Sequence, residues 1–200
     1  MAFENLKPVR NVGVGAQYQC FHDKPGEDGS LKFETTVSRL KTVASIETNE
    51  ERSTTPVYAS NEEYDVDVVN SPPTLAIENV AYPPSALARM RGNKVTNGFV
   101  EHSTYDDGEY FAHGVVYPKR GGHKKFVWYP KCRLVSSTNA AKTKDNGGSN
   151  SENKKLEIQS FAFNENGNYC IEYDTELLAN GTTPVTEEAF FAKPLLAPIQ

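Results

Sequence analysis

The chain has 200 residues and a mass of 22.1 kDa, enough for one domain with a substantial core and too little for two full enzyme domains. Hydrophobic residues make up 38% of it, which excludes disorder of the whole chain. The net charge of −5 argues against a coat protein that binds nucleic acid by neutralising phosphates.

Most of the chain has the residue pattern of β-strands. Eight runs are rich in β-branched and aromatic residues, and turn-forming pairs such as Asn97-Gly98 and Gly121-Gly122 separate nearly all of them. In chain order the runs are 11–22, 35–47, 62–69, 74–81, 109–117, 125–136, 156–163 and 168–173. We therefore predict a mainly β fold, an antiparallel β-sandwich or barrel of two packed sheets, in a single domain over residues 1–200.

One short flanking helix is predicted between the fourth and fifth runs. Two prolines precede Ser85 and the segment ALARMR, and Gly92 follows where a C-terminal cap belongs. A helix of about two turns is marginal by itself, so we expect Leu87 and Met90 to pack on a sheet.

The two ends of the chain are expected to form arms, over residues 1–10 and 176–200. In an exposed arm, the apolar side chains of the last segment would need a partner surface, for example on a neighbouring chain. These side chains are Phe190, Phe191, Leu195 and Leu196. The segment 144–153 reads as a polar loop.

The first residues and the cysteines indicate a cytoplasmic origin. The start MAFENLKPVRN has no apolar stretch typical of a secretory signal, and no run approaches the length of a membrane helix. Cys20, Cys132 and Cys170 have no CxxC spacing, so we expect buried, reduced thiols.

The charge is unevenly distributed along the chain. Residues 47–78 hold eight acids and one base, a balance of −7, and residues 119–155 hold ten bases and two acids, a balance of +8. Two explanations fit this distribution equally well: two solvated faces that happen to differ in charge, or complementary faces that serve self-association.

One predicted strand has a dry side and an acidic side. Over residues 63–69, three large apolar side chains alternate with three acids, Glu63, Asp65 and Asp67. An exposed surface strand would explain the pattern, and so would a face that repels a polyanion.

Catalytic and cofactor motifs are lacking in the sequence. Gly13-Val14-Gly15 has Tyr18 where a dinucleotide loop needs its third glycine, and phosphate-loop, GxSxG and HExxH motifs are missing. The four histidines lack the spacing of metal ligands. We therefore expect no enzyme activity, no cofactor and no metal.

The order of the segments resembles a known family. TTPVYASNEEYDVDVV, LAIENVAYPPSALARMRGNKV, YFAHGVVYPKRGGHKKFVWYPKCRLVSSTNAAKTKDN and LEIQSFAFNENGNYCIEYDT follow one another over residues 54–175. This series is similar to the major tail proteins, or tail-tube proteins, of long-tailed phages of Gram-positive bacteria, although the turn is Tyr58-Ala59-Ser60 where the family favours an acid.

The resemblance implies a structural virion protein with the tail-tube fold. Such proteins form hexameric rings that stack around a tape-measure protein, contact tail-end proteins, and conduct DNA from capsid to host without binding it specifically. The implied location is the virion tail, preferably of the non-contractile kind, with the host cytoplasm during assembly and no membrane partner.

The resemblance also gives the charged residues expected roles. A negative bore lets DNA slide, so we expect Glu63, Asp65, Asp67 and Glu78 to face the lumen. Bases of the predicted hairpin are candidates for contacts between subunits or rings. They are Lys119, Arg120, Lys124 and Lys125.

Two other classes of function are also compatible with the sequence. A carbohydrate- or receptor-binding β-sandwich could use an aromatic platform of Tyr105, Tyr110, Trp128 and Tyr129, although Trp128 suits a core position equally well. A small hydrolase has only scattered carboxylates to support it.

Overall fold

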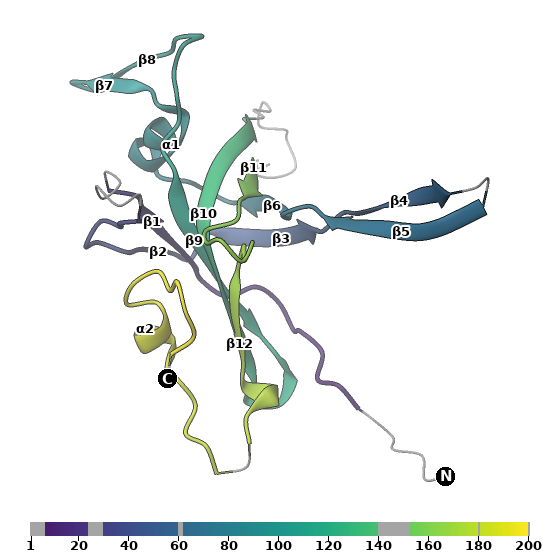
Figure 1. The fold of residues 1–200 in the computed structure, drawn as a ribbon. Coiled ribbons are helices and arrows are strands. Elements are labelled where there is room, and N and C mark those ends of the chain that lie inside the picture. The colour runs from purple at the N-terminus through teal and green to yellow at the C-terminus, as the bar shows by residue number, and fades with distance from the viewer. Residues whose placement is uncertain (1–6, 24–29, 60–61, 140–152, 180, 200) are drawn as a thin grey trace, which may run out of the picture.

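A computed structural model describes residues 7–23, 30–59, 62–139, 153–179 and 181–199 (Figure 1). The strands are β1 Gln17–Phe21, β2 Ser38–Leu40, β3 Val43–Asn49, β4 Arg52–Ala59, β5 Glu62–Asn70, β6 Thr74–Asn79, β7 Lys94–Thr96, β8 Phe99–Glu101, β9 Phe111–Pro118, β10 Lys124–Thr138, β11 Lys154–Ser160 and β12 Ile171–Asp174. The helices are α1 Pro84–Arg91 and α2 Glu187–Phe190, with two 3₁₀ turns, η1 Arg120–Gly122 and η2 Thr175–Leu177.

Eight of the described strands form one antiparallel sheet with β10 at its centre. The order is β2-β1-β9-β10-β11-β6-β3, and β12 pairs with the first half of β10 on the side where β11 pairs with its second half. The 15 residues of β10 therefore belong to two halves of the sheet, one with β1 and β9 and the other with β6 and β3. The predicted antiparallel, mainly β fold is confirmed.

The two halves of the sheet pack face to face around one apolar core. Phe21 and Phe111 from the first half meet Leu75, Ile77 and Ile158 from the second half in a single buried cluster. Side chains from both ends of one sheet can share a core only if the sheet folds over on itself, which gives the sandwich-like packing that the sequence predicts.

A second buried cluster covers the opposite face of β1, β9 and β10. The C-terminal segment lies along this face (Figure 1), and Phe190, Phe191 and Leu195 are buried against Trp128 and Phe126. The Phe191 ring stacks on Tyr18 at a centroid distance of 4.0 Å. The partner surface that we expected for these side chains is thus the chain's own sheet and not a neighbouring chain, and of the four apolar residues only Leu196 is exposed, at 42%.

The helix α1 confirms its predicted caps. It begins at Pro84, and Gly92 ends it in the left-handed conformation, φ 77°, with its N–H donating to the carbonyls of Ala88 and Arg89. Leu87 and Met90 are buried, as expected. No helix in the described residues has the length and apolar character required to cross a membrane.

The strand predictions hold best for the central strands. The runs predicted at 109–117 and 125–136 correspond to β9 and β10, whereas the run at 35–47 is divided between β2 and β3. The sequence reasoning missed β4, β7 and β8. Most of the polar loop expected at 144–153 lies outside the described residues. The thiols of Cys20 and Cys132 are free and buried, and Cys170 is free and half-buried.

Candidate assembly surfaces

The strands β4 and β5 form a separate two-stranded ribbon that extends away from the body of the molecule (Figure 1). One face of the ribbon is mostly apolar: it carries Val66, with Pro56 opposite, and Val68, with Thr54 opposite. The exposed fractions are 78% for Tyr64, 41% for Val66 and 57% for Val68. The predicted dry side of this strand therefore has no cover within the described chain.

Asp65 is exposed on the other face of the ribbon. It lies opposite Val57, and its Oδ1 accepts a hydrogen bond of 2.8 Å from the Val66 N–H. The backbones of Glu63 and Asp67 lie in the same strand, paired with Tyr58 and Thr55, while their side chains are outside the described part. Asp65 thus lies on the face opposite Val66, as the alternation predicts, but both faces are exposed in the described part of the subunit, so a dry side is not observed; the lumen-facing role stays a prediction.

Glu78 lies elsewhere, on the outer face of β6 in the main sheet. Its carboxylate accepts hydrogen bonds from Ser45 Oγ and Asn153 Nδ2, both at 3.2 Å. It borders a shallow depression of about 310 Å³, whose other lining residues include Glu47, Ser136, Lys155 and Glu157. The four predicted lumen acids therefore belong to two different sheets.

Three of the four predicted interface bases form ion pairs within their own chain. Lys119 Nζ contacts Asp174 and lies 2.7 Å from Glu176 Oε2, with only 10% of its side chain exposed. Lys125 pairs with Glu172 at 2.8 Å, and Lys124 approaches Glu187 at 3.6 Å.

These ion pairs hold β12, η2 and the C-terminal segment to the β9–β10 hairpin. The Lys119 ammonium donates hydrogen bonds to Asp174 and to Glu176, and both raise its pKa, the one to Asp174 more strongly. Much of the positive charge predicted for contacts between subunits is therefore used inside the subunit. The interface role of the four bases stays a prediction, and Arg120 alone among them has no ion pair in the described residues.

The four aromatic residues considered for a ligand platform do not come together on the surface. Trp128 and Tyr129 are adjacent on β10 and are buried on its opposite faces, in the two different clusters. Tyr110 is half-buried and Tyr105 is 93% exposed. The alternating burial of β10 thus gives Trp128 the core position that the sequence left open.

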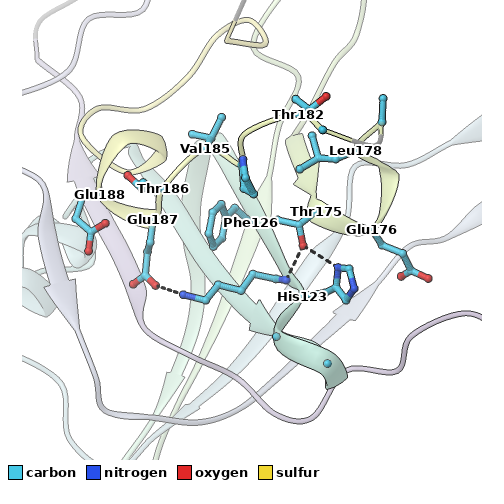
Figure 2. Close-up of a pocket in the computed structure, with 16 residues that line it drawn as sticks. His123, Phe126, Thr175, Glu176, Leu178, Thr182, Val185, Thr186, Glu187 and Glu188 are labelled. Atoms are coloured by element: carbon cyan, nitrogen blue, oxygen red, sulfur yellow. Dashed lines mark hydrogen bonds and ion pairs between the residues drawn. The ribbon is translucent and has the colours of Figure 1, made fainter.

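An open cleft of about 800 Å³ lies between the C-terminal segment and the β9–β10 turn (Figure 2). The Thr175 hydroxyl lies 3.4 Å from His123 Nδ1 and accepts a hydrogen bond of 2.9 Å from the Lys124 N–H. Glu187 is beside Lys124, and Phe126 forms part of the wall. Among its charged lining residues, Lys124 pairs with Glu187, and Glu176 pairs with Lys119 just outside the cleft. Across the described residues, no group of three or more metal-ligating side chains is found.

A second exposed hairpin was not anticipated. The strands β7 and β8 follow α1 and project from the end of the molecule remote from β12 (Figure 1). Asn97 and Gly98, with φ of 48° and 85°, form its two-residue turn, and Phe99 is 76% exposed. The Asn-Gly pair predicts such a turn, but the flanking strands have only three residues each, too few for a strand pattern.

Comparisons with known proteins assign no family to the chain. No family model and no curated protein matches it. Among solved structures, a chain from the "Cryo-EM structure of the anti-feeding prophage (AFP) baseplate, 6-fold symmetrised" aligns with 86% of this chain and 97% of its own length. The identity is 8% and the TM-score 0.43, values at which the alignment assigns no function.

Proposed function

We propose that this chain is a non-enzymatic structural subunit of a phage tail tube, as its resemblance to the major tail proteins implies. In this proposal the chain forms hexameric rings that stack around a tape-measure protein and end at tail-end proteins. The finished tube lies in the virion tail, is assembled in the host cytoplasm, and conducts DNA during ejection.

The uncovered β4–β5 ribbon is the observation that supports the proposal. An isolated two-stranded ribbon in water is marginally stable at best, and this ribbon presents a row of apolar side chains to solvent. Burial of one valine side chain contributes about 1.5–3 kcal/mol, so packing against a second subunit would stabilise both the ribbon and the contact. A ring or a stack supplies such a surface to each copy.

The unpaired edge of the main sheet supports the same conclusion. The strand β3 pairs with β6 on one side and with no described strand on the other. An exposed strand edge promotes uncontrolled association unless another strand or a cover protects it, and a closed ring gives each edge a partner.

We assign the bore to the outer face of β3, β6 and β11, which carries Glu78. Glu47, Glu78 and Glu157 outnumber Lys155 there, and small polar side chains such as Ser45 fill the space between them. A smooth, negative wall suits the passage of DNA, because bases would hold its phosphates. We thus keep the lumen role for Glu78 and replace it for Glu63, Asp65 and Asp67: these acids belong to a separate sheet and are then available for contacts between subunits.

The test is whether the purified chain assembles and whether its assembly needs the apolar face of the ribbon. We expect rings or tubes in negative-stain micrographs, and larger species in light scattering, as the concentration rises. The double variant Val66→Lys/Val68→Lys should require at least about tenfold more protein, since a loss of about 1.4 kcal/mol already changes an equilibrium constant tenfold.

A matched control carries the same change at exposed apolar sites away from the ribbon, Val80→Lys/Val135→Lys, which are 56% and 59% exposed in the wild type. A wild-type chain that stays monomeric at every concentration would refute the proposal. A monomer that bound glycans instead would favour the alternative of a carbohydrate- or receptor-binding module.

A further inference from the structure

Two arginines form no ion pair with an acid among the described residues, at the end of the molecule that holds the predicted interface bases. Lys119, Lys124 and Lys125 are paired within the chain. Arg120, in η1, and Arg10, in the N-terminal segment, are exposed and form no ion pair with any described residue. Within the described part of the chain, the structure thus separates the bases that hold the fold from the two that can bind a partner.

Backbone contacts fix these two arginines beside each other. The Arg120 N–H donates to the Arg10 carbonyl at 3.0 Å, and the Val12 N–H donates to the Pro118 carbonyl at 2.9 Å. The Val9 N–H donates to Glu176 Oε1 at 2.9 Å, which ties the N-terminal segment to the carboxylate that also binds Lys119. The arrangement is therefore part of the folded subunit.

Between the two segments lies a hollow of about 370 Å³, which we call the arginine notch. Its lining residues are Pro8, Val9, Arg10, Arg120, Gly121 and His123. Arg10 and Arg120 are its two basic lining residues, no acid of the described part lines it, and the nearby acids Asp174 and Glu176 both bind Lys119. The notch is thus an open, positively charged surface, and the expected occupant is acidic.

The chain itself carries an acidic, exposed segment that could occupy the notch of another copy. Residues 52–70 hold the four acids Glu62, Glu63, Asp65 and Asp67 and the single base Arg52, a charge of −3. Asp65 is exposed and has no ion pair in the described part. Strands of eight or nine residues extend about 25 Å, so the ribbon can reach past the edge of its own subunit.

We infer that the arginine notch of one subunit binds the acidic face of the β4–β5 ribbon of a second copy. This inference rests on the proposed function, because it names the surface that receives the ribbon when subunits associate. Head-to-tail contacts of this kind link each copy to the next and so produce closed rings or stacks. Arginine suits the role because its guanidinium binds carboxylates with two parallel hydrogen bonds.

The experiment exchanges the charges of the two surfaces. Arg10→Glu/Arg120→Glu puts acids opposite acids, and Asp65→Arg/Asp67→Arg puts bases opposite bases. We expect either pair to raise the concentration needed for assembly at least about tenfold. The quadruple variant, in which every contact is restored with reversed sign, should assemble at concentrations close to those of the wild type.

Controls separate the contact from the fold. Lys41→Glu/Lys193→Glu changes the same total charge at exposed sites and should assemble like the wild type. Trp128 fluorescence in urea checks that each variant remains folded. If the glutamates unfold the chain, Arg10→Gln/Arg120→Gln removes the charge without reversal and should weaken assembly and reduce its sensitivity to salt.

Three outcomes would overturn the inference. In the first, the notch variant assembles like the wild type although the Val66→Lys/Val68→Lys variant does not, which would leave the proposed function standing. In the second, the quadruple variant fails to recover. In the third, the notch variant loses binding to a DNA duplex and keeps its assembly, which would make a polyanion the occupant. A wild-type chain that never assembles refutes the proposed function itself.

Discussion

Alanine at Gly114 would place a methyl group in the space that the Phe191 ring occupies. A Cβ atom at Gly114 would lie 2.7 Å from Phe191 Cε1 and 3.0 Å from both Phe191 Cδ1 and Trp128 Cζ3. Gly114 is not among the residues with positive φ, so the alanine would act by steric overlap alone. The ring has little room to move, because Tyr18 stacks on it and Phe190 packs against it at 4.9 Å. Overpacking of this kind costs about 1–3 kcal/mol.

Urea unfolding followed by Trp128 fluorescence measures this cost. Trp128 is the only tryptophan, and its Nε1 donates to the Phe190 carbonyl at 3.1 Å, so the probe reports on the C-terminal segment directly. The control Leu177→Ala, at an exposed site, should change the stability by less than about 0.5 kcal/mol.

A double-mutant cycle identifies the cause. The smaller, more adaptable side chain of Phe191→Leu should make Gly114→Ala less costly by at least about 0.5 kcal/mol, because the two sites share one space. An equal cost in both backgrounds, or no cost at all, would show that the C-terminal segment does not depend on close packing at Gly114.

Three further predictions concern pH, charge and the cap of α1. Burial lowers the pKa of His113 to about 4 from 6.5, so between these values only the unfolded chain takes up the proton. Stability should fall by about 3 kcal/mol as the pH decreases from 6.5 to 4, and His113→Gln should flatten this profile in urea melts; parallel profiles would contradict the reasoning. Lys119→Glu should lower the melting temperature, since it places a third acid beside Asp174 and Glu176. Arg120→Glu should leave the melting temperature unchanged, and equal melting temperatures for the two variants would count against the ion-pair assignment. Gly92→Ala should lower the free energy of unfolding by more than about 1 kcal/mol in the same melts, because the φ of Gly92 is 77° and a Cβ there would lie 2.4 Å from the Asp107 carbonyl oxygen. A variant that unfolds like the wild type would show that the cap can relax.

The elements that the sequence predicts well have strong local signals. The strands β9 and β10 are long and rich in β-branched and aromatic residues, and Gly92 marks the end of α1 because few other residues adopt a left-handed conformation. The strand β4 was missed because its sequence, RSTTPVYA, is polar and contains Pro56, which is typical of a turn or an edge. Apolar and acidic residues alternate regularly in its partner β5, so the sequence predicts β5 but not the strand that pairs with it.

The assembly surfaces were predicted only in part for a different reason. Composition locates charges along the chain, but whether a charge is free depends on which other segment packs beside it. Lys119 and Arg120 are adjacent in sequence, yet one contacts Asp174 and Glu176 and the other contacts no acid in the described part. The same holds for Phe190 and Phe191, whose burial depends on the groove over β9 that Gly114 leaves open.

The sequence by itself therefore determined the fold class, the helix with its glycine cap and the alternation of apolar and acidic positions in β5, because each depends on the spacing of neighbouring residues. The tertiary structure decided which of these surfaces remain open to a partner. It folds the C-terminal segment onto the chain's own sheet, uses three bases in ion pairs, and leaves the β4–β5 ribbon and the arginine notch uncovered. Contacts between residues far apart in the chain control that outcome, and no local pattern contains them.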